Sequence, residues 1–221
     1  MDAFVAAAML GDVARATAIA SDFMAATDSR TAVVTDLLGA AQLLVDRRWR
    51  VGEARSEDEF RVSQAIEAVV ATLPPPAPPP EGLVAPQALL VTLRPEEHHL
   101  GLELAAVALA DDGWDIDIRY GQDLGDLIET VAQGRFRIVV ISSTYGAPEN
   151  ATRLTVAVRA LQAMGKPVVV GGQAFARDRA LAEVVGPDAT AADPRTGAVL
   201  ARRYRSREWR RWSRTRGSTG A

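Results

Sequence analysis

Six prolines within eight residues, LPPPAPPP at 73–80, constrain the fold of this chain more than any other feature. Proline lacks a backbone N–H and its ring clashes inside helices, so such a run favours polyproline II and acts as a semi-rigid spacer. We therefore expect a helical part at residues 1–73, a proline-rich linker at 74–86, a second domain at 87–200 and a separate C-terminal tail at 201–221.

Before the linker, apolar residues recur at helical spacing, as in the stripe that includes Val34, Leu37 and Leu38. The last segment opens at SEDE, where Ser56 is placed to cap the helix and Glu59 occupies the capping-box position. Four Ala-rich amphipathic segments predict a small four-helix bundle.

After the linker, short β-branched or apolar runs alternate with helix-like stretches of ten to sixteen residues. The expected strands are ALLVTL, DIDIRY, RIVVISS, KPVVVGG and PDATAA. The expected helices are GLELAAVALADDGW, DLGDLIETVAQG, NATRLTVAVRALQAMG and FARDRALAEVVG. This alternation predicts an α/β fold with a flavodoxin-like, doubly wound, parallel five-stranded sheet. Its ligand crevice lies at the carboxyl ends of the strands.

Composition excludes several classes of protein. The chain has no cysteine, which rules out disulfides and thiolate metal ligands and fits a cytoplasmic location. No apolar run reaches the roughly 18 to 20 residues of a membrane helix, and the N-terminus lacks the basic region of a signal peptide. We expect no membrane association.

The tail is strongly basic, with eight arginines and one glutamate from Ala201 onward. Aromatic residues are interleaved with these arginines, namely Tyr204, Trp209 and Trp212. Three interpretations stay open: a solvated or self-docked extension of the last helix, a contact with a protein partner or subunit, and nucleic-acid binding through phosphate contacts and stacking.

The turn after the first expected strand, RPEEHHLG, contains both histidines of the chain. It carries two carboxylates where a dinucleotide-binding turn has glycines, and no P-loop occurs, so nucleotide binding in the standard modes is not expected. Glu96 precedes His98 by two residues and could orient a metal-bound imidazole. One histidine with no cysteine is too few ligands for zinc, but it suffices where a macrocycle supplies the remaining ligands.

The pattern Glu96-x-His98-x-x-Gly101 resembles the D-x-H-x-x-G signature of cobalamin-binding domains. The resemblance implies that His98 displaces the dimethylbenzimidazole base and coordinates cobalt from below. It implies that Glu96 and Gly101, together with Leu100 inside the motif, belong to the cofactor site. His99 is expected to point away and to start the helix.

Two further segments extend the resemblance. VVISSTYG is similar to the third-strand segment of this family, with Ser142 and Thr144 in the matching places. VVVGGQAFA is similar to the fourth-strand Gly-Gly, matched by Gly171 and Gly172. In the family these positions line the slot that holds the detached nucleotide tail.

Upstream, VDRRWRVGEARSEDEF resembles the helical cap that covers the upper face of the corrin, with Trp49 and Gly52 in the W-x-x-G places. This implies that Trp49, Glu59 and Phe60 lie near the cofactor. Light-sensing members carry a histidine after the glutamate, where this chain has Phe60. No other histidine is available for a light-driven switch to two axial histidines.

The resemblance implies cobalamin, as adenosylcobalamin or another form, in a non-catalytic light-responsive sensor that acts through a homo-oligomer or a protein partner. A resemblance to photocobilins also implies biliverdin above the corrin, near Trp49, Glu59 and Phe60. The alternative is a corrinoid methyl-carrier protein of a methyltransferase system, although that family usually has a strict Asp where this chain has Glu96. A third interpretation is a scaffold domain that has lost the cofactor.

Overall fold

The computed structural model describes residues 1–205. The chain divides into two compact units, residues 1–75 and the residues from 76 onward. Trp209 and Trp212 of the predicted basic tail lie outside the described residues.

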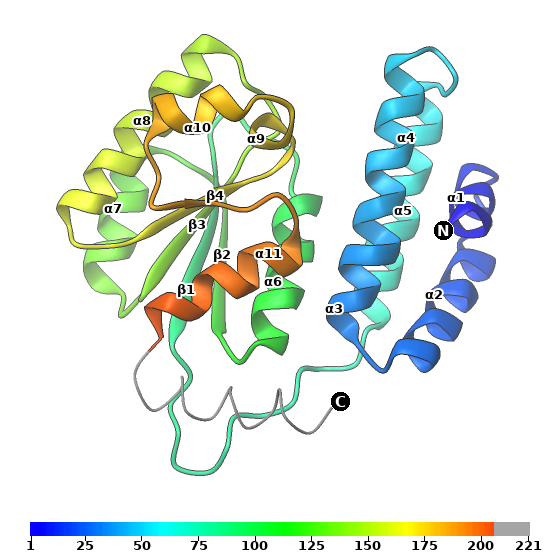
Figure 1. Ribbon diagram of the computed structural model, residues 1–221, viewed down its shortest axis with the longest axis horizontal. Coiled ribbons are helices and arrows are strands. Elements are labelled where there is room, and N and C mark those ends of the chain that lie inside the picture. The colour runs from blue at the N-terminus through cyan, green and yellow to red at the C-terminus, as the bar shows by residue number, and fades with distance from the viewer. Residues whose placement is uncertain (206–221) are drawn as a thin grey trace. The chain divides into compact units, whose positions relative to one another are not determined.

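The first unit is helical, as predicted, and is consistent with a helical cap (Figure 1). Its elements are α1 (Asp2–Met9), α2 (Val13–Thr27), α3 (Arg30–Ala32), η1 (Val33–Gly39), α4 (Ala40–Arg50) and α5 (Ser56–Thr72). The elements α3, η1 and α4 form one continuous helix with a π-helical stretch in its middle, which periodicity alone did not predict. The apolar stripes meet in a core that includes Phe4, Val34, Leu38, Val45, Val62 and Ile66.

The predicted capping box at the start of α5 is wrong by one residue. Ser56 is the first helical residue, and Asp58 takes the capping-box position by accepting a hydrogen bond from the Arg55 N–H at 2.8 Å. The Ser56 hydroxyl instead accepts a hydrogen bond from Trp49 Nε1 at 3.2 Å. Glu59 therefore has no capping role.

The second unit contains a fully parallel five-stranded sheet with strand order β2-β1-β3-β4-β5, which confirms the predicted flavodoxin-like fold (Figure 1). The strands are β1 (Gln87–Leu93), β2 (Asp115–Gln122), β3 (Ile138–Ser142), β4 (Val168–Gly171) and β5 (Ala189–Thr190). The strand order reverses between β1 and β3, and ligands of doubly wound sheets bind beyond the carboxyl ends of the strands at such a point.

The three central strands are buried on both faces, which is why they appear in the sequence as continuous apolar runs. Alternate residues point to opposite faces of the sheet. One face forms a core with α7 (Leu124–Gln133) and α8 (Pro148–Ala163). Its members include Leu89, Val91, Val139, Ile141, Val168, Val170, Leu127, Leu154 and Leu161.

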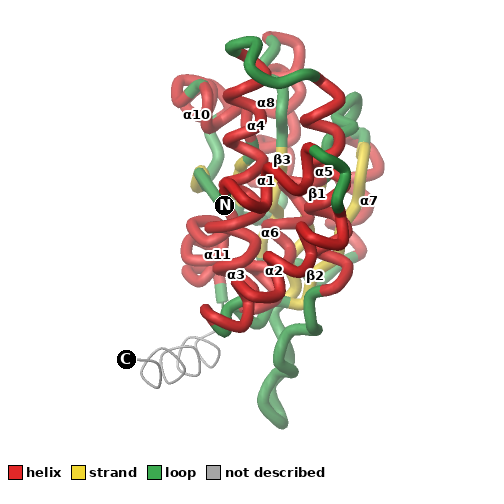
Figure 2. Tube along the Cα trace, turned by 90° about the vertical axis from the view of Figure 1, so that its right-hand side faces the viewer, coloured by secondary structure: helices red, strands yellow, loops and turns green. Residues whose placement is uncertain are grey.

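On the other face, α6 (Leu100–Asp111) packs against α11 (Pro194–Ala201), and the two helices lie side by side in Figures 1 and 2. The single helix predicted over 175–186 is instead two short helices, α9 (Gln173–Arg177) and α10 (Arg179–Val185). Asp178 breaks the helix because its backbone is extended and its carboxylate accepts the Ala180 N–H to cap α10.

The chain leaves α11 through a short 3-10 helix, η2 (Arg202–Tyr204), and is attached there to the end of α6. Arg205 is buried, forms an ion pair with Asp112 and lies over the Trp114 ring, and Arg202 binds the same carboxylate at 2.9 Å. Burial raises the pKa of Asp112, against the hydrogen bond from Arg202, and lowers the pKa of Arg205. The first residues of the basic tail therefore dock on the acidic body.

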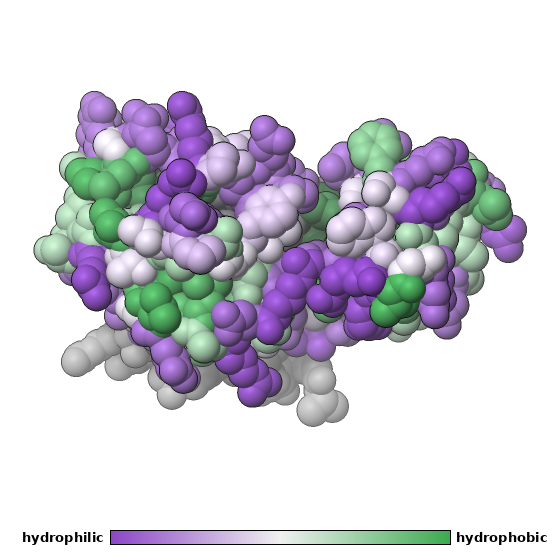
Figure 3. All heavy atoms as spheres, turned by 90° about the horizontal axis from the view of Figure 1, so that it is seen from above, coloured by the Kyte–Doolittle hydropathy of each residue, from purple (hydrophilic) through white to green (hydrophobic). Residues whose placement is uncertain are grey.

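Within residues 1–205, no helix is long and apolar enough to cross a bilayer. The face of the molecule seen from above in Figure 3 intermixes hydrophilic and hydrophobic residues.

Candidate functional site

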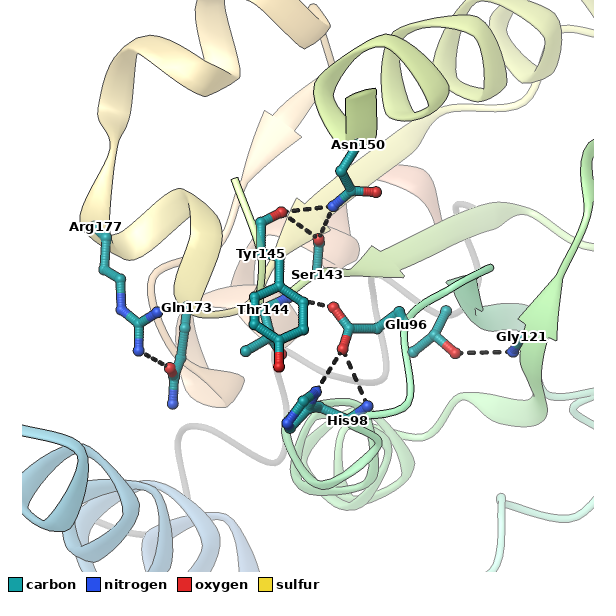
Figure 4. Close-up of polar contacts among 10 residues, drawn as sticks. Glu96, His98, Gly121, Ser143, Thr144, Tyr145, Asn150, Gln173 and Arg177 are labelled. Carbon is teal, nitrogen blue, oxygen red and sulfur yellow. Dashed lines mark hydrogen bonds and ion pairs between the residues drawn. The ribbon is translucent and has the colours of Figure 1, made fainter. Parts of the chain in front are cut away.

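The loop between β1 and α6 is organised around a buried carboxylate. Glu96 is only 6% exposed, and one of its oxygens, Oε1, accepts the His98 N–H at 3.0 Å. The other, Oε2, accepts the Thr144 N–H at 2.6 Å, from the loop that follows β3. One side chain therefore joins the loops after the two strands that flank the point of reversed strand order (Figure 4).

This carboxylate also fixes the orientation of the His98 imidazole. Glu96 Oε1 lies 2.8 Å from His98 Nδ1, so the proton of the neutral ring is placed on Nδ1 and the lone pair on Nε2. No described residue is hydrogen-bonded to Nε2, and the His98 side chain is 54% exposed. The ring therefore presents a free, oriented nitrogen donor to solvent.

A tyrosine from the β3–α8 loop contacts the same ring. The centroids of the His98 and Tyr145 rings are 5.2 Å apart at an interplanar angle of 81°, an edge-to-face arrangement (Figure 4). The Tyr145 carbonyl accepts hydrogen bonds from Ser143 Oγ at 3.2 Å and from Asn150 Nδ2. Asn150 also donates to Ser143 Oγ at 2.8 Å, so the loop that carries Tyr145 is held at several points.

Beside the loop, two glycines lie against the predicted serine. A Cβ at Gly101 would lie 3.6 Å from Ser142 Oγ. A Cβ at Gly172 would lie 2.4 Å from the Ser143 carbonyl oxygen and 3.0 Å from Ser142 Oγ, and the φ angle of Gly172 is +95°. At position 172, glycine alone avoids this clash and adopts the positive φ angle without strain.

The other predicted residues of this unit lie at the same carboxyl edge of the sheet. Gly171 ends β4, where a Cβ would lie 3.3 Å from the Ala191 carbonyl oxygen. Leu100 is the first residue of α6 and is half-buried. The structure thus brings together the predicted motif, the Ser-x-Thr segment and the Gly-Gly pair.

Sequence reasoning missed three contributions to this site. Tyr145 was not singled out, although it follows the Ser-x-Thr segment directly, and Asn150 gave no pattern to detect. Thr144 was chosen as a hydroxyl-bearing residue, but the contact that orders the site is made by its backbone N–H. A backbone contact of this kind leaves no trace in a single sequence.

His99 has a different environment from His98. It occupies the N-cap position of α6, as expected of a residue that starts the helix. Its ring lies 4.2 Å from the Tyr120 ring, and the Tyr120 hydroxyl donates to Glu103 at 3.1 Å. Burial, with the nearby Glu103 carboxylate, raises the pKa of Tyr120 to about 12.

The remaining predicted residues belong to the helical unit. Trp49 near the end of α4 and Phe60 in the first turns of α5 are large aromatic residues left 44% and 61% exposed. Glu59 is half-buried beside Phe60. The hydrogen bond from Trp49 to Ser56 places all three around the turn between α4 and α5. Their role at a cofactor stays a prediction.

The second unit offers one oriented histidine nitrogen, which fits a metal whose other ligands come from a macrocycle. Residues 1–205 contain no group of three or more His, Cys, Asp or Glu side chains placed to hold a metal ion. One imidazole with a free Nε2 and a carboxylate on Nδ1 is a complete axial ligand for a metal inside a macrocycle. The glycines at 101 and 172 let their backbone lie close to Ser142, next to the loop that carries the imidazole.

Comparisons with known proteins agree with this chemistry. Residues 86–201, more than half of the chain, match the B12 binding domain family. No curated protein sequence matches the chain.

Two solved structures share the fold. A monomethylamine corrinoid protein from Methanosarcina barkeri has a TM-score of 0.69 at 16% identity, with 90% of this chain and 94% of that chain covered. A cobalamin-binding protein from Desulfitobacterium hafniense has a TM-score of 0.51 at 17% identity, with 92% and 98% covered. On the family match and this site, the chain belongs to the B12 binding domain family, and its cofactor is cobalamin.

Proposed function

We propose that this chain is a corrinoid carrier protein that holds cobalamin through His98 and presents it to partner proteins for methyl transfer. The observation that carries the proposal is the His98 imidazole, held through Nδ1 by a buried carboxylate with Nε2 left free. Cobalamin, when bound, would supply the cobalt centre at which methyl transfer takes place.

The residues of the chain would hold that cofactor in three ways. His98 Nε2 would be the lower axial ligand, and Glu96 would keep the ring in the required tautomer and raise its basicity as a ligand. Ser142, Gly171 and Gly172 would line the space for the nucleotide tail, since they end β3 and β4 at the same edge of the sheet as the His98 loop. Thr144 would act through its N–H, which fixes the far oxygen of Glu96.

Trp49, Glu59 and Phe60 would contact the upper face of the corrin. Two aromatic side chains are exposed at one turn of the helical unit, where their rings would pack on a planar macrocycle. A carrier has to uncover this face of the corrin for its partners.

A carrier is favoured over a light sensor by two observations. The monomethylamine corrinoid protein resembles this chain over nearly its whole length. The helical unit contains no histidine, so a switch to two axial histidines of the kind found in some light sensors has no second ligand. The light-sensor interpretation, with biliverdin near Trp49 and Phe60, stays the second candidate because the exposed aromatic surface would suit a planar chromophore.

The test starts with cobalamin titrations of the purified full chain, followed by absorption spectroscopy. The His-ligated spectrum is expected in the wild type and in the matched control His99→Ala, and it is expected to be lost in His98→Ala. An unchanged spectrum in His98→Ala would overturn the assignment of the ligand.

The same preparation separates carrier from sensor. A carrier is expected to exchange methyl groups with a corrinoid-dependent methyltransferase and to keep the same oligomer size in dark and light. A light-dependent change in size or spectrum, with or without added biliverdin, together with no methyl transfer, would establish the sensor instead.

A further inference from the structure

A second pocket lies at the opposite, amino-terminal edge of the sheet, where the chain enters β3 and β4. Its volume is about 470 Å³, within the range of small-molecule sites. It is lined by Arg135, Phe136, Arg137, Gly165, Lys166, Pro167 and Tyr204. None of these residues belongs to the cobalamin site described above.

The backbone places two arginines on the same side of this pocket. Burial alternates along the approach to β3, with Arg135 and Arg137 exposed and the Phe136 ring inserted at 7% exposure. The ring lies against Gly134, where a Cβ would be only 2.1 Å from it. With the ring between them buried, both arginine side chains leave the backbone on the exposed side and line the pocket.

A third cation, Lys166, lines the same pocket. Lys166 precedes β4, and its Nζ donates to the Phe136 carbonyl oxygen at 3.0 Å. That carbonyl belongs to the residue between the two arginines in the sequence, so the ammonium is anchored to the segment that carries them. Lys166 is the only lysine in the chain.

These charges have no carboxylate partner in the described part of the chain. Within residues 1–205, no ion pair involves Arg135, Arg137 or Lys166. The carboxylate of Asp188, which acts electrostatically on Tyr204, already accepts hydrogen bonds from the Val168 N–H and the Gln162 amide. Gathered cations repel one another, and a bound anion would relieve that repulsion.

We propose that this pocket binds a phosphate-bearing small molecule. Two guanidinium forks and an ammonium match the charge and the oxygen geometry of a phosphate group better than those of a single carboxylate. The pocket volume leaves room for an organic group beside Tyr204. The site is independent of the proposed carrier function, and it can be tested on cofactor-free protein.

The single lysine makes a direct test possible. Reductive methylation of the full chain with carbon-13 formaldehyde yields one labelled lysine signal, from Lys166, besides that of the N-terminal amine. The probes are pyrophosphate and adenosine monophosphate, each compared with sodium chloride at matched ionic strength, because screening alone also shifts exposed charges.

We expect at least one of the two probes to shift the Lys166 signal saturably, while chloride does not. In Arg135→Gln/Arg137→Gln the affinity is expected to fall about tenfold or more, since both guanidinium groups that would donate charge-assisted hydrogen bonds to the phosphate are lost. The matched control, Arg153→Gln/Arg159→Gln, replaces two exposed arginines of α8 and is expected to bind as the wild type does.

Two outcomes would overturn the proposal. One is the absence of a saturable shift with both probes. The other is equal affinity in the Arg135/Arg137 variant, which would mean an adventitious ion only. The N-terminal amine signal serves as the internal reference, since its response reports general screening rather than binding in the pocket.

Discussion

The charged side chains at the two edges of the parallel sheet differ in burial and in their partners. At the carboxyl edge, the Glu96 carboxylate is buried and each of its oxygens accepts at least one hydrogen bond, from the two loops of the candidate cobalamin site. At the amino edge, three cations line one pocket with no carboxylate partner among the described residues, and Lys166 donates to the Phe136 carbonyl. A buried, satisfied charge fixes geometry within the protein, whereas an exposed and unsatisfied cluster leaves its interactions for a ligand.

The amino edge also contains a contrasting pair, Arg205 and Asp112, in which a buried cation has its counter-ion. The pKa shifts of both groups are in the direction set by desolvation, so the pair itself adds little net stability. Removing one member of the pair is expected to lower stability strongly, because the other charge then stays buried without a counter-ion.

The largest expected effect therefore comes from Asp112→Asn. We expect this change to lower the free energy of unfolding by about 3 kcal/mol, since Arg205 remains buried without its partner. Urea denaturation followed by circular dichroism measures it. The matched control is Arg202→Gln, which removes a 53% exposed partner of the same carboxylate and should cost less than about 1 kcal/mol. Equal losses in the two variants would contradict the distinction between buried and exposed partners.

The next effect concerns the carboxyl edge. Glu96→Ala removes the acceptor for His98 and for the Thr144 N–H, and we expect the dissociation constant for cobalamin to rise about 10–100-fold. Absorption titration gives the constant. Glu96→Asp, the usual residue of the family, is the control and should retain most of the affinity through the contact to His98. Wild-type affinity in Glu96→Ala would show that the carboxylate does not support the ligand.

A smaller effect is expected from Tyr145→Ala, which removes the edge-to-face contact with His98. Aromatic pairs of this geometry contribute about 0.5–1.5 kcal/mol, so cobalamin affinity should fall about 2–10-fold. Tyr145→Phe keeps the ring and should bind as the wild type does. The His98 imidazole resonances of cofactor-free protein provide a second measurement, and they should move in the alanine variant alone.

The smallest effect is a titration at high pH. Because the pKa of Tyr120 is raised to about 12, the folded state keeps a proton that the unfolded chain loses near 10. The free energy of unfolding should therefore decline as pH rises from about 10 to about 12, and Tyr120→Phe should remove that part of the decline. Phenolate absorbance, with circular dichroism as the check on folding, should lose its transition near 12 in the variant. A transition that persists there would assign it to another tyrosine.

Much of the second unit was predictable because its information is local. Buried central strands appear as apolar runs, and the crossover helices between them carry turn residues at their ends. The site motif was predictable for the same reason, since Glu96, His98 and Gly101 lie within six residues. The errors were also local. The capping box of α5 lies one residue earlier than predicted, with Asp58 rather than Glu59 accepting the N-cap N–H. The helix predicted over 175–186 is divided in two because the Asp178 carboxylate caps a new helix.

The sequence by itself determined the alternation of strands and helices in the second unit and the local motif that places Glu96 two residues before His98. Only the tertiary structure decided which partners those residues have. Thr144 reaches Glu96 across 48 residues of sequence, and Lys166 reaches Phe136 across 30. Parallel strands bring distant loops to a common edge, and the contacts there depend on strand order and register, which periodicity does not contain.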